Sequence, residues 1–434
     1  MSNDYYSSRN YASRLLGDRL VFYMPYALMR ARHHGGEPEV GYTLPAVRTR
    51  GRERWDDVID VQQIYRPIQP TRNPALHTVV SCDLSRAELS CEAQGILGPW
   101  GRSFYVSRDA VYVWVGGEHW SDDTDGEPRG AVYRLPFDGT APGAVRVSGM
   151  PVDQLSFAER ERHLNVLVRS RGGGDWMWAP EVASGDIALA RLPLALFTDG
   201  VTSAQRTHYR PLPRLSGGAF QNRFVGEHLL YGTGSGWGHA RREGHGQVVV
   251  HAVDSGATSV LALPHGVDRL DVLGRDAIVV GAGGGDLHFS AVALEGTPRV
   301  AGHYAQPGAS QGETRSHGFF FHRTGEGSGT LGLPIRGGRG AGWHHLVEGS
   351  AGVLFLDVDR RRFRRRGVLE SRGARVDDAC QASCVDWYGN ARPIFYRGRV
   401  FALLGYELVE GAFDDGPIRE VRRTHLYRDM PRRR

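Results

Sequence analysis

One short phrase recurs along the chain and constrains the fold more than any other feature. A glycine-containing or polar turn leads into an apolar strand in the segments LLGDRLVFYM (15–24), VSRDAVYVWV (106–115), FVGEHLLYG (224–232), VLGRDAIVVG (272–281) and FYRGRVFALLG (395–405). Each copy has the pattern of two β-strands joined by a tight turn. A further apolar strand often follows, as in GAVYRLPFDG (130–139), GQVVVHAVDSG (246–256) and AGVLFLDVDR (351–360).

The copies are separated by roughly 50 to 60 residues or a multiple of that distance. Repeats of this length with four strands each are typical of a β-propeller, whereas a sandwich would not repeat one phrase so often. We therefore expect an all-β fold with few helices, a single closed β-propeller of about seven blades (six to eight). Both ends of this region are rich in strands, so we expect one blade to be completed by strands from both termini. The predicted division is a flexible lead (1–11), the propeller (12–427) and a basic tail (428–434).

The composition agrees with a folded domain and excludes two other classes of protein. Hydrophobic residues make up 41% of the 434 residues and charged residues 23%, which allows a sizeable core and argues against global disorder. Glycine is abundant, with 58 residues, but no Gly-x-y period accompanies it, so the chain is not collagen-like. The net charge of +5 is mild, and we do not expect a nucleic-acid partner from it.

Four cysteines fall in two local pairs, Cys82 with Cys91 and Cys380 with Cys384. Such pairing favours two short-loop disulfides and an oxidising compartment, with free thiols as the alternative and a zinc site as a weaker one, because the spacings fit zinc knuckles poorly. The first twelve residues are polar, and no segment has the length and apolarity of a membrane span. The chain is thus either a secreted or envelope protein in its mature form or a cytoplasmic one, and the disulfide interpretation favours the first.

Several stretches of the sequence resemble a known family. The segments ASRLLGDRLVFYM (12–24), WGRSFYVSRDAVYVWVGG (100–117), SHGFFFHRTGEGSGTLGLPI (316–335) and FYRGRVFALLGYELVEG (395–411) are similar to those of bacterial and archaeal secreted proteins with a C-terminal β-propeller domain. The resemblance implies an exported envelope protein without an established general activity. Members usually carry further chain, including an export signal, before the segment that corresponds to 14–24.

Two charged clusters are candidate binding sites. Asp122, Asp123, Asp125 and Glu127 bring closely spaced carboxylates beside a glycine, which suits Ca²⁺, although a solvated acidic hairpin tip is the simpler interpretation. No other cofactor is expected. The densest charge of the chain is the run of Arg360, Arg361, Arg362, Arg364, Arg365 and Arg366. Guanidinium groups bind carboxylates, phosphates and sulfates in bidentate fashion, so this run is a candidate anion-binding patch, with a solvated outer turn as the alternative.

These features favour a binding protein over an enzyme. The first hypothesis is a non-enzymatic binding or scaffolding propeller of the cell envelope that holds a protein, peptide or glycan on its rim or channel mouth. The alternatives are a hydrolase or lyase with a site at the channel mouth, and a cytoplasmic protein-interaction hub. The G-x-S-x-G match at 308–312 does not support a hydrolase, because Pro307 interrupts the strand that such a serine needs before it. No catalytic residue is assigned, and the pattern does not predict the oligomeric state.

Overall fold

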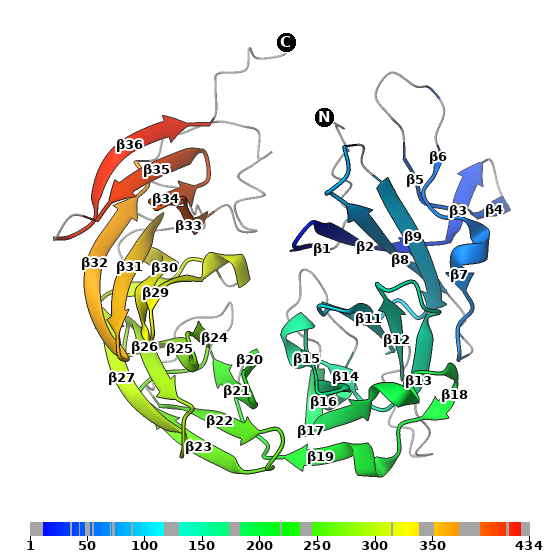
Figure 1. Ribbon diagram of the computed structural model, residues 1–434, viewed down its shortest axis with the longest axis horizontal. Helices are drawn as coiled ribbons and strands as arrows, with labels where there is room; N and C mark the ends of the chain where they lie inside the picture. Colours follow the sequence, from blue (N-terminus) through cyan, green and yellow to red (C-terminus); the bar gives the residue numbers. More distant parts are fainter. Residues whose placement is uncertain are drawn as a thin grey trace. The chain divides into compact units, whose positions relative to one another are not determined.

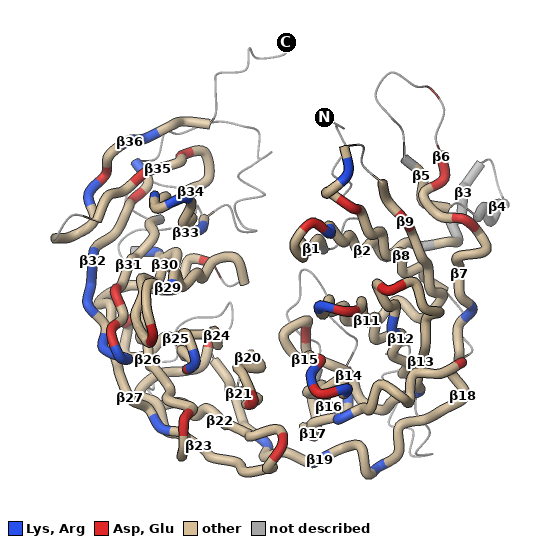
Figure 2. Tube along the Cα trace, in the orientation of Figure 1, with Lys and Arg blue, Asp and Glu red and all other residues tan. Residues whose placement is uncertain are grey.

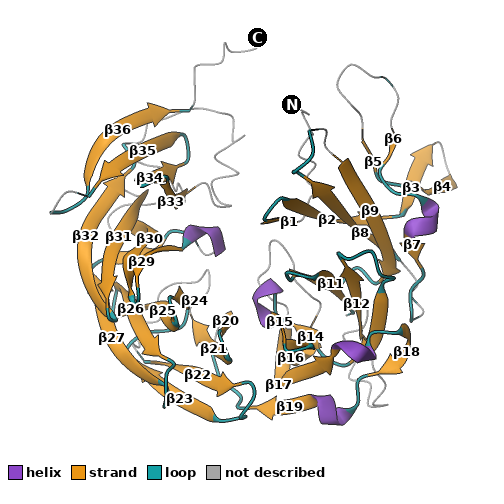
Figure 3. Cartoon of the chain, viewed as in Figure 1, coloured by secondary structure: helices purple, strands orange, loops and turns teal. Residues whose placement is uncertain are grey.

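The computed structural model consists almost entirely of β-strands (Figures 1 and 3). It describes residues 12–426 except 35–36, 43, 48–52, 54–55, 70, 72–73, 88–89, 117–129, 173–182, 218, 235–244, 314–315, 338–350, 373–390 and 414–415. Helical structure in the described part is limited to short 3-10 turns, η1 (Val61–Gln63), η2 (Gln154–Ser156), η3 (Leu194–Leu196), η4 (Arg206–His208) and η5 (Ser316–Gly318). The prediction of an all-β chain with few helices is confirmed.

The chain divides into two compact units, Met1–Arg214 and Leu215–Arg434. Unit 1 holds three five-stranded sheets. The first has the order β1 (Ala12–Leu16), β2 (Arg19–Ala27), β8 (Ala75–Asp83), β9 (Ser90–Gly98), β7 (Ile64–Tyr65). The second has the order β10 (Arg102–Val106), β11 (Ala110–Val115), β12 (Gly130–Pro136), β13 (Gly143–Val147), β18 (Asp199–Ser203). The third has the order β14 (Met150–Pro151), β16 (His163–Gly172), β17 (Ala183–Pro193), β19 (Tyr209–Leu212), with β15 (Phe157–Arg160) also on β16. Two small hairpins lie in the chain between β2 and β8. They are β3 (Met29–His34) with β4 (Glu37–Tyr42), and β5 (Ala46–Val47) with β6 (Asp56–Asp57).

Unit 2 holds four more sheets of the same kind, in which strands follow one another in chain order. The first consists of β20 (Ala219–Val225), β21 (His228–Gly234), β22 (Gly246–Ala252) and β23 (Thr258–Leu263). The second consists of β24 (Arg269–Leu273), β25 (Asp276–Gly283), β26 (Asp286–Ala293) and β27 (Arg299–Gln306). The third consists of β28 (Ala309–Gln311), β30 (Ser328–Gly337), β31 (Ala351–Asp359) and β32 (Arg362–Glu370), with β29 (Phe320–Gly325) also on β30. The fourth consists of β33 (Ala391–Tyr396), β34 (Arg399–Leu404), β35 (Glu407–Ala412) and β36 (Arg419–His425).

The core of each unit lies between the faces of neighbouring sheets. In unit 2, Val248 and Val250 of β22 pack with Ala277 and Val279 of β25, and all four are almost completely buried. Similar apolar clusters join each later pair of sheets in unit 2 and each pair of successive sheets in unit 1. Each fully buried valine or leucine stabilises the folded state by about 1.5–3 kcal/mol, so this face-to-face burial is the main stabilising term. Antiparallel four-stranded sheets packed in series are the building plan of propeller blades.

The order of strands gives unit 2 two distinct edges. The first strands β20 and β24 contact each other, and the last strands β27, β32 and β36 do so in turn (Figure 1). We call these the first-strand edge and the last-strand edge. In propellers, such four-stranded sheets surround a central channel.

Within the described residues, no sheet combines strands from both ends of the chain, so the expected shared blade is not seen there. Strand β2 pairs with β1 on one side and, over its whole length, with β8 on the other. The last sheet is made of β33–β36, all from the C-terminal part of the described chain. Both hydrogen-bonding sides of β2 are thus used by N-terminal strands.

Candidate binding surface

The arginine run predicted from the sequence forms a hairpin on the last-strand edge of unit 2 (Figure 2). We call β31, β32 and their turn the basic hairpin (351–370). Asp359 pairs with Arg362 in register, which leaves Arg360 and Arg361 as a two-residue turn with φ angles of 45° and 71°. This left-handed conformation suits the right-handed twist of a hairpin but is unfavourable for residues other than Gly, Asn and Asp. A further interaction must therefore hold the turn.

That interaction is an ion pair with the neighbouring sheet. The Nε and Nη2 atoms of Arg361 donate to the two carboxylate oxygens of Asp276, at 2.6 and 3.2 Å. Asp276 is almost buried at the start of β25 and also accepts from the backbone N–H of Leu294. The hydrogen bond to Asp276 raises the pKa of Arg361, against a smaller opposing effect of burial. The bidentate pair fixes the turn on the preceding sheet.

A second acidic residue neutralises two more arginines. Asp357 of β31 accepts from Arg364 and Arg366 of β32, each at 2.8 Å, and from Thr330 at 2.7 Å. Burial would raise the pKa of Asp357, but these three hydrogen bonds outweigh it and hold the pKa below its usual value. Arg366 is buried and lies over the ring of Phe413, 5.0 Å from its centroid. These two guanidinium groups are structural.

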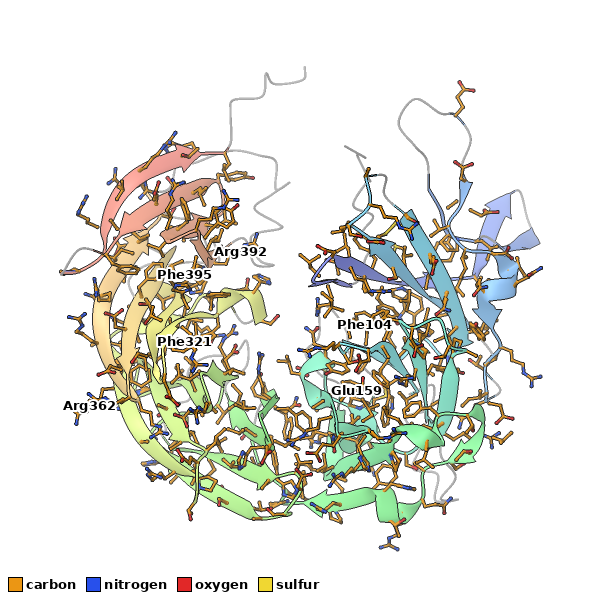
Figure 4. The ribbon with its side chains drawn as sticks, viewed as in Figure 1. Phe104, Glu159, Phe321, Arg362, Arg392 and Phe395 are labelled. Atoms are coloured by element: carbon orange, nitrogen blue, oxygen red, sulfur yellow. A yellow bond between two sulfur atoms is a disulfide. The ribbon has the colours of Figure 1, made fainter. Side chains whose placement is uncertain are left out.

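The remaining cations of the run face solvent. Arg360 lies 3.6 Å from the exposed carboxylate of Asp359, a weak surface pair. Arg365 donates to the neutral side chain of Gln306, at 3.3 Å. Arg362 is exposed and lies on the outward side of β32 (Figure 4). Within the described part of the chain, no carboxylate bonds to Arg362 or Arg365, so these two residues carry the available positive charge of the predicted patch.

Charged side chains on the first-strand edge of unit 2 form ion pairs and hydrogen bonds with neighbouring residues. Arg223 of β20 lies 3.0 Å from Asp271 of β24, and Arg269 donates to the backbone oxygen of Glu313 at 2.8 Å. Asp271, Arg269 and Glu313 are each about 95% buried. The carboxylate of Glu313 lies 3.7 Å from the imidazole of His317. This network spans three successive sheets, which local sequence patterns do not reveal.

The cysteine prediction is confirmed for one pair. Cys82 and Cys91 face each other on β8 and β9 and form a disulfide, with their Cα atoms 4.0 Å apart. Cys380 and Cys384 lie outside the described residues, as do the predicted calcium ligands Asp122, Asp123, Asp125 and Glu127. Over the described ranges, no group of three or more His, Cys, Asp or Glu side chains is arranged to hold a metal ion.

The structure also tests two other features of the sequence. Ala309–Gln311 of the G-x-S-x-G match forms the short strand β28 rather than a strand-to-helix turn, as expected. No helix in the described part is long and apolar enough to cross a membrane.

A match to a known family model agrees with this architecture. Residues 3–196 match the family model described as a beta propeller domain. The chain has a β-propeller fold. The WD40 domain of Toxoplasma gondii coronin is similar at 11% identity over 74% of this chain and 70% of that one, with a TM-score of 0.35. Acylaminoacyl peptidase of Pyrococcus horikoshii is similar at 9% identity over 95% of this chain, with a TM-score of 0.38, and the match spans 52% of the peptidase. A comparison with curated protein sequences gives no match.

Proposed function

We propose that this propeller is a non-enzymatic binding protein of the bacterial cell envelope or exterior that holds an acidic polysaccharide on its basic hairpin. The observation that carries the proposal is the pair of exposed guanidinium groups, Arg362 and Arg365, which no described carboxylate neutralises. The ion pair of Arg361 holds the hairpin on the preceding sheet, and those of Arg364 and Arg366 hold its two strands together, so Arg362 and Arg365 sit on a supported hairpin. The Cys82–Cys91 disulfide supports an oxidising compartment.

The chemistry of this surface favours a polysaccharide over a protein partner. Protein interfaces are usually centred on desolvated aromatic or apolar side chains. The outward side of β32 instead presents Arg362, Arg364 and Arg365, and the nearby ring of Phe363 is half-buried. Evenly spaced carboxylates or sulfates on a sugar chain can meet such guanidinium groups in bidentate fashion without an apolar centre.

Binding to a carboxylated polysaccharide tests this proposal. We expect the protein to bind polygalacturonate, and not neutral dextran, with an affinity that falls steeply with salt. The double variant Arg362→Gln/Arg365→Gln should bind about tenfold more weakly or worse, since it loses two charge-assisted contacts. The matched control Arg108→Gln/Arg206→Gln removes two exposed arginines of unit 1 and should bind like the parent. Equal affinity of both variants, or tighter binding to polyglutamate than to the polysaccharide, would overturn the proposal.

A second candidate function rests on Glu313 and His317. A buried carboxylate beside an imidazole on the first-strand edge is a pairing that glycoside hydrolases or lyases can use for proton transfer. If the protein cleaves polygalacturonate, new reducing ends accumulate and Glu313→Gln abolishes them. No release of reducing ends over long incubation would exclude cleavage of this substrate.

A further inference from the structure

Three histidines of unit 2 form a compact group that local sequence patterns do not predict. We call them the histidine column: His265 in the connection between β23 and β24, His288 on β26 and His303 on β27. Ring centroids lie 5.3 Å apart for His265 and His288, and 5.2 Å apart for His288 and His303. The residues are separated by 23 and 15 positions in the chain, so only the folded sheet brings them together.

Hydrogen bonds fix the protonation of the column at neutral pH. The Nε2–H of His288 donates to the backbone oxygen of Gly283 at 2.9 Å, so its Nδ1 accepts from the Nε2–H of His303 at 3.0 Å. The Nδ1–H of His265 donates to the backbone oxygen of Gly266 at 2.7 Å, and its Nε2 accepts from the hydroxyl of Ser290 at 2.8 Å. A neutral imidazole has one donor and one acceptor, and this assignment uses both on His265 and His288.

Added protons disrupt this arrangement. A protonated His288 carries hydrogen on both nitrogens, so its Nδ1–H would face the Nε2–H of His303 and their bond would be lost. The pKa of His265 is lowered to about 4, mainly by burial; the hydrogen bond to Gly266 opposes this shift, and the charges of His288 and His303 add to it. Burial is also the main cause that lowers the pKa of His303, and the charge of His288 lowers it as well.

Among the described residues, the carboxylates near the column already accept other hydrogen bonds. Asp268, in the same connection as His265, accepts from the backbone N–H of Ala282, and Asp286 of β26 accepts from the N–H of Gly308. Asp276 at the start of β25 is held by Arg361. The other charged group of β27 is Arg299 at its far end, which adds positive charge. The charges that act on the pKa of His265 are those of His288 and His303.

Strand β27 connects the column to the basic hairpin. Gly302, next to His303, lies against the backbone oxygen of Arg361 with no room for a side-chain carbon. Gln306, at the end of the same strand, accepts from Arg365 at 3.3 Å. A displacement of β27 therefore changes the support of both the turn and one of the two exposed cations.

We propose that the histidine column is a proton-responsive element that loosens β27 and the basic hairpin in mildly acidic solution. The loosening follows from the broken His288–His303 bond and the repulsion between imidazolium groups. The consequence for partner release rests on the proposed function, whereas the loosening itself does not. A binding protein with this element would hold its polysaccharide near neutral pH and release it in acid.

Hydrogen exchange of backbone amides in the full chain tests the proposal. After correction for intrinsic rates, we expect peptides of β26, β27 and the basic hairpin to exchange about tenfold faster at pH about 5 than at pH about 7, in a buffer with a metal chelator. The variant His303→Gln keeps a side-chain N–H donor toward His288 at an exposed position, so it should fold and lose most of this acid response. His163→Gln in unit 1 serves as the matched control and should keep it.

The two proposals fail separately in this experiment. Two results would overturn the proton-responsive element, even if polygalacturonate binds at neutral pH. One is that exchange in the parent does not depend on acid. The other is that both His303→Gln and the double variant His288→Gln/His303→Gln keep the acid response of the parent. An acid response that depends on His303, in a protein that does not bind polygalacturonate, would support the element and overturn the proposed partner.

Discussion

At the scale of single residues, the value of an ion pair depends on how much water reaches it. Arg361–Asp276 and Arg399–Glu410 are both bidentate and both carboxylates are largely buried, but the arginine is 29% exposed in the first pair and 54% exposed in the second. We expect Asp276→Asn to lower the free energy of unfolding of unit 2 by about 1–3 kcal/mol, because Arg361 loses a charged acceptor and the left-handed turn loses its anchor. Urea denaturation followed by peptide-resolved hydrogen exchange measures the loss. Glu410→Gln should have a much smaller effect, and equal losses would contradict the argument.

The same residues show where sequence-based prediction ends. The arginine run is visible in the sequence, and its outward-facing members are the ones that carry the predicted patch. Its partners are not visible, since Asp276 lies 85 residues before Arg361 and Gln306 lies 59 residues before Arg365. The sequence does not predict the histidine column either, because its three members lie far apart in the chain. Charge density is a local property of the chain, whereas charge compensation is a property of the fold.

At the scale of elements, turn signals predicted hairpins well and strand partners poorly. The segment VLGRDAIVVG forms β24 and β25 around Gly274, whose φ of 70° suits glycine. The segment LLGDRLVFYM likewise contains the end of β1 and the start of β2. Strand β2 pairs with β8, more than forty residues later in the chain, and the described sheets do not include the expected blade made from both termini. Alternating apolar residues indicate that a strand exists, but they do not indicate which strand it pairs with.

The cross-strand disulfide is an element-scale stabiliser of unit 1. The bond between Cys82 and Cys91, which have a sequence separation of 9, closes a short loop and so lowers the conformational entropy of the unfolded chain. We expect the double variant Cys82→Ala/Cys91→Ala to lower the free energy of unfolding by about 2–3 kcal/mol. Urea denaturation with and without reductant measures this, and reductant should leave the double variant unchanged at this hairpin. A parent protein that reacts fully with a thiol reagent at Cys82 and Cys91 before reduction would contradict the bond.

At the scale of the whole molecule, the number of sheets was the most predictable property. The described part of the chain contains seven sheets of four or five strands, which agrees with about seven blades. The count follows from the repeat spacing, and each of the five copies of the phrase lies in the first hairpin of a different sheet. The compact units Met1–Arg214 and Leu215–Arg434 have no counterpart in the sequence pattern, since no change of composition marks residue 214. Closure of the ring stays a prediction.

Both units also contain a buried histidine with a lowered pKa, from which we expect the stability of each unit to fall in acid. In unit 1, the Nδ1 of His77 accepts from the hydroxyl of Tyr23 at 2.7 Å, and its Nε2–H donates to the backbone oxygen of Pro99 at 2.8 Å. Burial lowers the pKa of His77 to about 4, as it does for His265 in unit 2. The ordinary value of 6.5 applies in the unfolded chain, so between these two pH values the unfolded state binds protons that the folded state does not.

Stability should therefore be greatest above pH about 6.5 and fall as the pH drops toward about 4, by at most about 3 kcal/mol for each ring. Urea denaturation at a series of pH values measures the slope, and peptide-resolved exchange assigns it to a unit. In His77→Gln, unit 1 should lose most of its acid slope while unit 2 keeps its own, because His265 and the rest of the column are intact. His163→Gln is the control in unit 1, since its ring bonds to the backbone oxygen of Glu161 at an exposed turn. If unit 1 of His77→Gln loses stability in acid as steeply as the parent, carboxylates rather than this buried imidazole set its acid limit.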